Sequence, residues 1–166
     1  MQASYLSDFI SLLFAELCRA CAESTVAGIG DLLGNIAAEQ LTQNAVFNNA
    51  DLIIPVPLHK SRLTKRGYNQ SVCFAAGLSQ KLNIPVDEDN LVRIRATETQ
   101  THRSRFSRFE NMQEVFTLTN PEALINKHVL LVDDVITTGS TLEAGGAELL
   151  KAEGLKLTIA TIACAQ

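Results

Sequence analysis

The sequence predicts one α/β domain built on a central, mostly parallel β-sheet with helices on its faces. Its 166 residues, 46% hydrophobic and 19% charged, have the length and composition of a single core-forming domain. Near the end of the chain an apolar strand over 128–134, a polar loop, a helix over 142–154 and a strand over 155–165 follow one another. This order of strand, helix and strand is typical of parallel sheets. A second apolar run, over 51–57, contains two prolines and predicts a buried strand that ends in a rigid loop.

The spacing of apolar residues predicts the elements that precede and connect these strands. Apolar side chains recur at a helical period in three segments, over 5–17, 29–43 and 67–83. Two short extended pieces follow, over 84–86 and 91–94. The next segment, 95–108, is rich in arginine and threonine without a clear period, so it predicts a mobile loop or a short exposed helix. We expect residues 1–50 to form an N-terminal helical part and residues 51–166 to form the sheet domain.

Composition excludes several classes of protein. No apolar run approaches the roughly 18 residues that a membrane-spanning helix needs, so we expect no membrane insertion. The first apolar segment has no lysine or arginine before it, unlike a secretion signal. The cysteines do not have the spacing of a disulfide framework, which indicates a reducing, cytoplasmic setting. They are Cys18, Cys21, Cys73 and Cys164.

Charge is distributed unevenly along the chain. The formal net charge is −4, yet the segment 59–108 holds ten of the fourteen lysines and arginines and only four acidic residues. This segment therefore carries +6 and the rest of the chain carries −10. A basic middle in an acidic protein indicates a local anion site, for a phosphorylated small molecule or for the backbone of a nucleic acid.

The segment that follows the strand over 128–134 has the parts of a phosphate site. Hydroxyl side chains and Gly139 lie between this strand and the next helix, at the sheet edge where helix N-termini offer free N–H groups. An ATPase or GTPase loop is excluded because Gly139 is followed by Ser140 and not by lysine. Asp133 and Asp134 directly precede the loop. Two carboxylates beside a phosphate favour a sugar phosphate, whose hydroxyls they bind, together with Mg²⁺.

Several strings in the sequence resemble those of a known family. Residues 129–141, VLLVDDVITTGST, closely resemble the 5-phosphoribosyl-1-pyrophosphate (PRPP) signature of type I phosphoribosyltransferases. The strings PVPLH, over 55–59, and RGYNQ, over 66–70, resemble the ComF/GntX family, the competence-protein branch of that fold, as does the arginine-rich segment. The resemblance covers about residues 51–164 and implies the three-layer type I phosphoribosyltransferase fold. Relative to that family, an internal N-terminal segment is missing.

The resemblance implies roles for individual residues. Asp133 and Asp134 would be the catalytic carboxylates, holding the ribose hydroxyls and the water around Mg²⁺. The 5-phosphate of PRPP would be held by Thr137, Thr138, Gly139, Ser140 and Thr141. The loop after the first predicted strand would hold pyrophosphate, through Val56, Pro57, Leu58, His59, Lys60 and Arg66. A mobile loop that closes over the substrate would contribute Arg95, Arg103 and Arg105.

The family implies a Mg²⁺-dependent phosphoribosyltransferase, a pentosyl-transferring glycosyltransferase that releases pyrophosphate from PRPP. The alternative is a non-catalytic competence module that serves DNA uptake and binds single-stranded DNA through the basic middle segment.

The chain departs from the family pattern at several positions. Thr137 stands where purine-salvage members carry an acidic residue, which disfavours a hypoxanthine or guanine acceptor. The family's zinc site uses two CxxC pairs, and only the pair Cys18 and Cys21 is present. These two cysteines would need ligands from a second chain or from other residue types to close a zinc site, so no metal ligands are assigned. The missing segment would expose apolar surface, which would allow two copies of the chain to form a homodimer.

Overall fold

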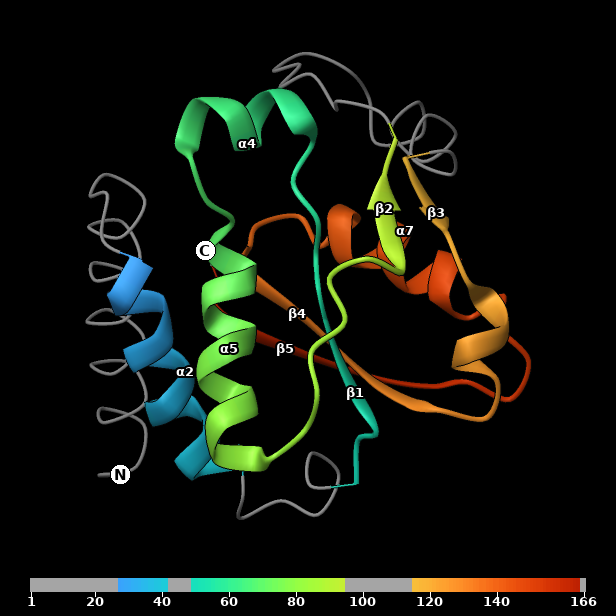
Figure 1. Cartoon of the computed structure of the whole chain (residues 1–166), viewed down its shortest axis with the longest axis horizontal. Coiled ribbons are helices and arrows are strands. Elements are labelled where there is room, and N and C mark those ends of the chain that lie inside the picture. The colour runs from blue at the N-terminus through green and yellow to red at the C-terminus, as the bar shows by residue number, and fades with distance from the viewer. Residues whose placement is uncertain (1–26, 42–48, 95–114, 165–166) are drawn as a thin grey trace.

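The computed structural model describes residues 27–41, 49–94 and 115–164 (Figure 1). The helix expected over 5–17, the N-terminal CxxC pair and the arginines of the expected mobile loop lie outside these residues. In the described part of the chain, no helix is long and apolar enough to cross a membrane. The elements in chain order are α2 (Ala27–Leu41), β1 (Leu52–Pro55), α4 (Lys60–Arg66), α5 (Gln70–Leu82), β2 (Leu91–Arg93), β3 (Phe116–Leu118), the 3-10 helix η1 (Pro121–Leu124), β4 (His128–Ile136), α7 (Ser140–Leu149) and β5 (Lys156–Cys164).

Three strands form the central sheet, in the order β1, β4, β5. Both pairs are parallel, because Leu52 of β1 pairs with Val129 of β4, and Val129 pairs in turn with Leu157 of β5. The first part of β4 is a continuous buried apolar run, as a parallel strand covered by helices on both faces requires. The prediction of an α/β domain with a central parallel sheet flanked by helices is therefore confirmed.

Helices cover both faces of this sheet (Figure 1). Because side chains alternate along a strand, Leu130 of β4 packs with Phe74 of α5, whereas Leu131 packs on the other face with Leu142 of α7. The α2 helix packs beside α5 (Figure 1), contacts β5 and buries Ala38 in the same core as Phe74 and Leu130. The two helices approach so closely at Gly34 that a Cβ atom there would lie 2.5 Å from the carbonyl oxygen of Phe74.

A second, two-stranded sheet pairs β2 with β3 in antiparallel register, with Leu91 opposite Leu118. The buried side chains of Leu91 and Phe116 belong to the same core as α7. Asn90 fixes the end of this small sheet, since its side chain donates to the carbonyl oxygen of Asn120 and accepts from the N–H of that residue, each at 3.0 Å. The extended piece expected at 91–94 is β2, whereas β3 is an element that the pattern analysis did not predict.

Residues 60–66 form α4 where the sequence predicts a rigid loop. The helix begins after His59, whose Nδ1 accepts from the N–H of Ser61 at 3.3 Å, and it ends at Gly67, which takes the left-handed conformation with φ of 83°. All of its described side chains are exposed. An exposed helix leaves no apolar period in the sequence, which is why the pattern does not reveal α4. At the other end of the chain, α7 ends at Leu149, earlier than the expected 154.

Candidate functional site

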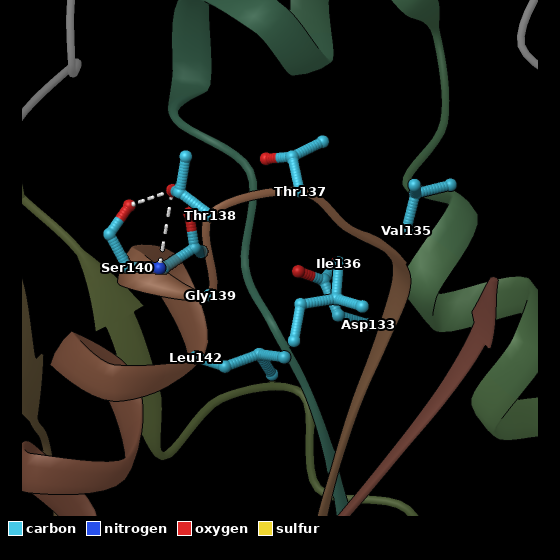
Figure 2. A pocket seen from close by; sticks show the side chains of 9 residues that line it. Asp133, Val135, Ile136, Thr137, Thr138, Gly139, Ser140 and Leu142 are labelled. Carbon is cyan, nitrogen blue, oxygen red and sulfur yellow. Dashed lines mark hydrogen bonds between the residues drawn. The ribbon is translucent and has the colours of Figure 1, made fainter. Parts of the chain in front are cut away.

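The candidate site lies at the carboxyl end of β4, where the chain leaves the sheet and enters α7. A pocket opens there, and Figure 2 shows its side chains gathered around the turn between the two elements. Every residue of the predicted phosphate loop lines this pocket, together with one of the two predicted carboxylates. The lining residues are Asp133, Val135, Ile136, Thr137, Thr138, Gly139, Ser140, Thr141 and Leu142.

The turn into α7 is suited to holding an anion. Gly139 takes the left-handed conformation with φ of 77°, which a residue without a Cβ atom adopts at little cost. It stands at the N-cap position and has no side chain that would bind the first N–H groups of α7. The hydroxyls of Thr138 and Ser140 share a hydrogen bond of 2.8 Å beside it (Figure 2). The Thr138 hydroxyl also accepts from the N–H of Ser140 at 3.5 Å (Figure 2). The N–H groups at the start of α7, the hydroxyls and the positive end of the helix dipole together favour a phosphate.

Asp133 is held in place by hydrogen bonds to a single oxygen of its carboxyl group. The Ser71 hydroxyl donates to Oδ1 at 2.9 Å, and the N–H of Asp134 donates to the same atom at 2.9 Å. Ser71 belongs to the first turn of α5 and is 3% exposed. Both donors use Oδ1, so they fix the orientation of this carboxyl group at the end of β4.

The surroundings of Asp133 change its acidity. Burial, the neighbouring charge of Asp134 and a hydrogen bond with the Asp134 side chain together raise the pKa of this carboxyl group from 3.8 to about 7, and burial is the largest of these causes. The hydrogen bonds from Ser71 and from the Asp134 N–H oppose this rise, because they stabilise the ionised form. Near neutral pH both the protonated and the ionised form of Asp133 are therefore populated.

Asp134 differs from Asp133 in its surroundings. Its Oδ1 accepts a hydrogen bond from the N–H of Val135 at 2.8 Å. Among the described residues it is not one of those that line the pocket. The structure thus places one predicted carboxylate in the pocket and the other directly beside it.

The loop predicted to hold pyrophosphate runs from the end of β1 into α4. Val56 is buried, and its N–H donates to the carbonyl oxygen of Val132 at 2.8 Å, so the loop starts next to β4. Pro57, Leu58 and His59 then lead to α4 and are half-buried. Lys60 and Arg66 are the first and last residues of α4, and both are exposed.

An internal polar contact ties α4 to the helix that follows. The guanidinium of Arg66 donates to the Oε1 atom of Gln70, whose side chain is buried at the start of α5. This bond directs the Arg66 side chain toward α5, and the predicted role of Arg66 in binding pyrophosphate stays a prediction.

Arg93 is a buried cation that the sequence analysis did not assign to the site. It lies at the end of β2, and its guanidinium carbon is 5.4 Å from the ring centre of Phe116. Burial lowers its pKa, and the positive charge of Arg62 on α4 lowers it further. The negative charge of Asp133 acts in the opposite direction, so Arg93 lies within electrostatic reach of both α4 and the Asp133 carboxyl group.

The carboxylate oxygens of Asp133 and Asp134 are candidate ligands for Mg²⁺ at the pocket. In the described ranges no group of three or more histidine, cysteine, aspartate or glutamate residues comes together. Mg²⁺ is commonly bound through one or two carboxylates, water and the phosphates of a substrate. Asp133 and Asp134 fit this mode, in which the ion binds together with a phosphorylated ligand.

Two polar residues make specific contacts at the site: Asn69, which belongs to the string RGYNQ on which the family resemblance rests and which that resemblance places in support of the pyrophosphate loop, and Ser71, which was not predicted. Ser71 holds Asp133, and Asn69 donates from Nδ2 to the carbonyl oxygen of Val56 at 3.0 Å. Both lie at the start of the helix that follows the first strand and its loop. Polar residues at that position face the carboxyl edge of a parallel sheet, and this is the sequence feature that would have indicated them.

Comparison with known proteins identifies relatives of this chain. The family model of the phosphoribosyl transferase domain matches residues 68–166. The DNA utilization protein YhgH of Escherichia coli strain K12 is 40% identical over 104 residues, which are 63% of this chain and 44% of that protein. Competence protein F of Haemophilus influenzae is 42% identical over 93 residues, 55% of this chain and 41% of that protein. The chain thus spans less than half the length of these curated relatives.

Solved structures share the fold at low sequence identity. The glutamine PRPP amidotransferase from B. subtilis, complexed with ADP and GMP, superposes with a TM-score of 0.53 at 20% identity, covering 81% of this chain and 26% of the other. A purine phosphoribosyltransferase from Pyrococcus horikoshii superposes with a TM-score of 0.51 at 22% identity, covering 80% of this chain and 74% of the other. At these identities the likeness establishes the fold.

Proposed function

The chain belongs to the phosphoribosyl transferase domain family, in its ComF branch, and on this premise we propose that it binds PRPP at the carboxyl end of β4. We further propose that it transfers the phosphoribosyl group to an acceptor, with Mg²⁺, and releases pyrophosphate. We also propose that the reaction takes place in the cytoplasm, the reducing setting that the cysteine spacing indicates.

The observation that carries this proposal is the joining of a carboxylate and an anion-binding turn in one pocket. Asp133 lines the pocket opposite Thr138, Gly139 and Ser140 (Figure 2). A phosphate needs hydrogen-bond donors, and a ribose hydroxyl needs an acceptor. A pocket with donors on one side and a carboxylate on the other matches a sugar that carries a phosphate on its 5-position.

We assign each part of PRPP to one part of this arrangement. The turn over 137–141 would bind the 5-phosphate through backbone N–H groups and hydroxyls. Asp133 would accept hydrogen bonds from the ribose hydroxyls. The loop over 56–60 starts beside β4 and would receive the pyrophosphate, with positive charge supplied by Arg62 and Arg93. Mg²⁺ would neutralise part of the charge on the pyrophosphate.

These groups would promote displacement at the anomeric carbon. The bond from this carbon to pyrophosphate breaks with its electron pair going to pyrophosphate, the acceptor forms the new bond, and the acceptor loses its proton to solvent. The positive charge that develops on the ribose is stabilised by the ionised Asp133, which is already in position. Cations around the loop over 56–60 stabilise the negative charge on the leaving group, so no covalent enzyme intermediate is needed.

Thermal unfolding with ligands tests the proposal directly. PRPP at about 100 times its dissociation constant stabilises a protein by about 2.7 kcal/mol, which raises the unfolding midpoint of a domain this size by about 5 to 10 °C. We expect this shift with PRPP and Mg²⁺ together, a smaller shift with ribose 5-phosphate, and a loss of the PRPP shift in Gly139→Ala. Pyrophosphate release with a panel of amine acceptors then measures turnover.

A matched control separates site effects from general effects. Asp89 is exposed and distant in sequence from the pocket residues, so Asp89→Asn should keep the full PRPP shift. A wild-type chain that unfolds cooperatively and shows no Mg²⁺-dependent shift with PRPP would refute the proposal.

A second candidate function is supported by α4 and by the relatives. Lys60, Arg62 and Arg66 are exposed on this helix, which has no acidic residue, and the relatives are named for competence and DNA utilization. A non-catalytic module that binds single-stranded DNA would use these cations. Its affinity for a labelled oligonucleotide should fall steeply with salt and should drop in Lys60→Gln with Arg62→Gln. Salt-independent binding, or none, would exclude this candidate.

A further inference from the structure

The start of α5 contacts both loops of the candidate site. Asn69, the N-cap residue, binds the carbonyl oxygen of Val56 in the loop after β1. Ser71, two residues later, binds the carboxyl group of Asp133 at the end of β4. The contacted residues are 13 and 62 positions away in the sequence, so these bonds join segments that the chain itself does not hold together.

Asn69 uses both ends of its amide group. Its Oδ1 accepts from the N–H of Ser71 at 3.2 Å and so caps α5, while its Nδ2 donates to the carbonyl oxygen of Val56 at 3.0 Å. Capping alone needs only an acceptor, which aspartate supplies equally well. The bond to Val56 needs a donor, and aspartate has none. The Nδ2 group of Asn69 is therefore not needed to cap α5, and its hydrogen bond serves the loop after β1.

Ser71 acts on the orientation of a carboxyl group. Its side chain is 3% exposed, and its hydroxyl donates to Asp133 Oδ1 at 2.9 Å. The N–H of Asp134 donates to the same oxygen, so two donors from different elements fix the plane of the carboxyl group. With the Ser71 hydroxyl removed, the Asp133 carboxyl group would keep only its contacts with the adjacent Asp134 and would lose its tie to α5, so the side chain could rotate.

We propose that Asn69 and Ser71 are positioning residues. They hold the loop over 56–60 and Asp133 in a fixed position relative to each other, so that one PRPP molecule can contact both. This inference rests on the proposed function, because it assigns the pyrophosphate to the loop and the ribose to Asp133. Neither residue touches the substrate. Asn69 acts through the backbone of Val56, and Ser71 acts through the Asp133 carboxyl group.

The two residues should affect different parts of the ligand. Asn69→Asp keeps the helix cap and replaces the donor by an acceptor that repels the Val56 carbonyl oxygen, so pyrophosphate affinity should fall by about tenfold. Ribose 5-phosphate affinity should change little in this variant. Ser71→Ala should give the reverse pattern, with about a tenfold loss for ribose 5-phosphate and little change for pyrophosphate. Both variants should lose PRPP affinity.

Calorimetric titration of the full chain with Mg²⁺ and each of the three ligands tests this division. Ser79→Ala is the matched control, since it removes a hydroxyl from the same helix away from the site, and it should bind all three ligands as the wild type does. Equal losses for both partial ligands in Asn69→Asp and Ser71→Ala would overturn the positioning roles, and so would unchanged affinities.

Amide hydrogen exchange of the ligand-free chain tests the positioning roles independently of whether PRPP binds. Asn69→Asp should speed exchange at the Val56 N–H, and Ser71→Ala should speed exchange at the Asp134 N–H, while the later turns of α5 stay protected in both. A wild-type chain that binds none of the three ligands refutes the proposed function. Unchanged exchange at both N–H groups overturns the positioning roles whether or not PRPP binds.

Discussion

Replacing Asp133 by asparagine should make the folded protein more stable at neutral pH. The pKa of this carboxyl group is about 7 in the folded chain, against 3.8 for the ordinary group, because of burial and the nearby Asp134. Between about pH 4 and pH 7 the folded state therefore keeps a proton that the unfolded state has lost. The free energy of unfolding therefore falls as the pH rises through this window. Asparagine does not ionise, so the Asp133→Asn protein should not lose this stability.

The size of the effect follows from the two pKa values. One pKa unit corresponds to about 1.4 kcal/mol, so the difference between 3.8 and about 7 corresponds to about 4 kcal/mol at and above neutral pH. The pocket is open, and water that enters it screens part of this cost. We therefore expect Asp133→Asn to gain about 2 kcal/mol at pH 7, or about 4 to 8 °C in the unfolding midpoint.

Urea unfolding of the wild type and of Asp133→Asn between pH 4 and pH 8 measures this difference. The gain should be below about 1 kcal/mol at pH 4 and should grow steadily toward pH 7. Asp89→Asn, a substitution of the same kind at an exposed position, should stay within about 0.5 kcal/mol of the wild type throughout. An Asp133→Asn protein that is less stable at pH 7, or whose gain is the same at pH 4, would refute the reasoning.

Three further predictions concern ligand binding and packing. PRPP affinity should fall by about tenfold between pH 8 and pH 6 as Asp133 takes up its proton, and a flat calorimetric profile would count against a ribose contact. Gly139→Ala should cost about 1 to 2 kcal/mol in urea unfolding because φ is 77° there. Gly34→Ala should cost about 1 to 3 kcal/mol, since the new Cβ atom would meet the Phe74 carbonyl oxygen at 2.5 Å; a neutral substitution would mean that α2 packs on α5 less closely.

The last strand, loop and helix of the site could be predicted from the sequence. The apolar run before Asp133, the hydroxyl-rich turn with Gly139 and the helix after it are adjacent along the chain. Their order alone places a carboxylate and a phosphate loop at one edge of a parallel sheet. The mostly parallel α/β architecture follows from the same order, because a strand, a helix and a strand in succession produce parallel pairing.

Short or exposed elements escaped this kind of prediction. The α4 helix has exposed side chains and therefore no apolar period, and β3 is only three residues long. The ends of α4 are set by the His59 cap and the left-handed Gly67, and β3 is set by its pairing with β2. A pattern of hydrophobicity does not record such ends.

The tertiary structure alone decided how the site is held and how it titrates. Ser71 and Asp133 are 62 residues apart, and their hydrogen bond exists because α5 packs beside the carboxyl end of β4. The raised pKa of Asp133 likewise comes from burial, which only the packed chain provides. The sequence by itself determined which chemical groups meet in the β4–α7 turn, because those groups are covalent neighbours. Contacts with Ser71, Asn69 and Arg93 depend on the packing of distant segments. The order of residues around the turn does not predict that packing.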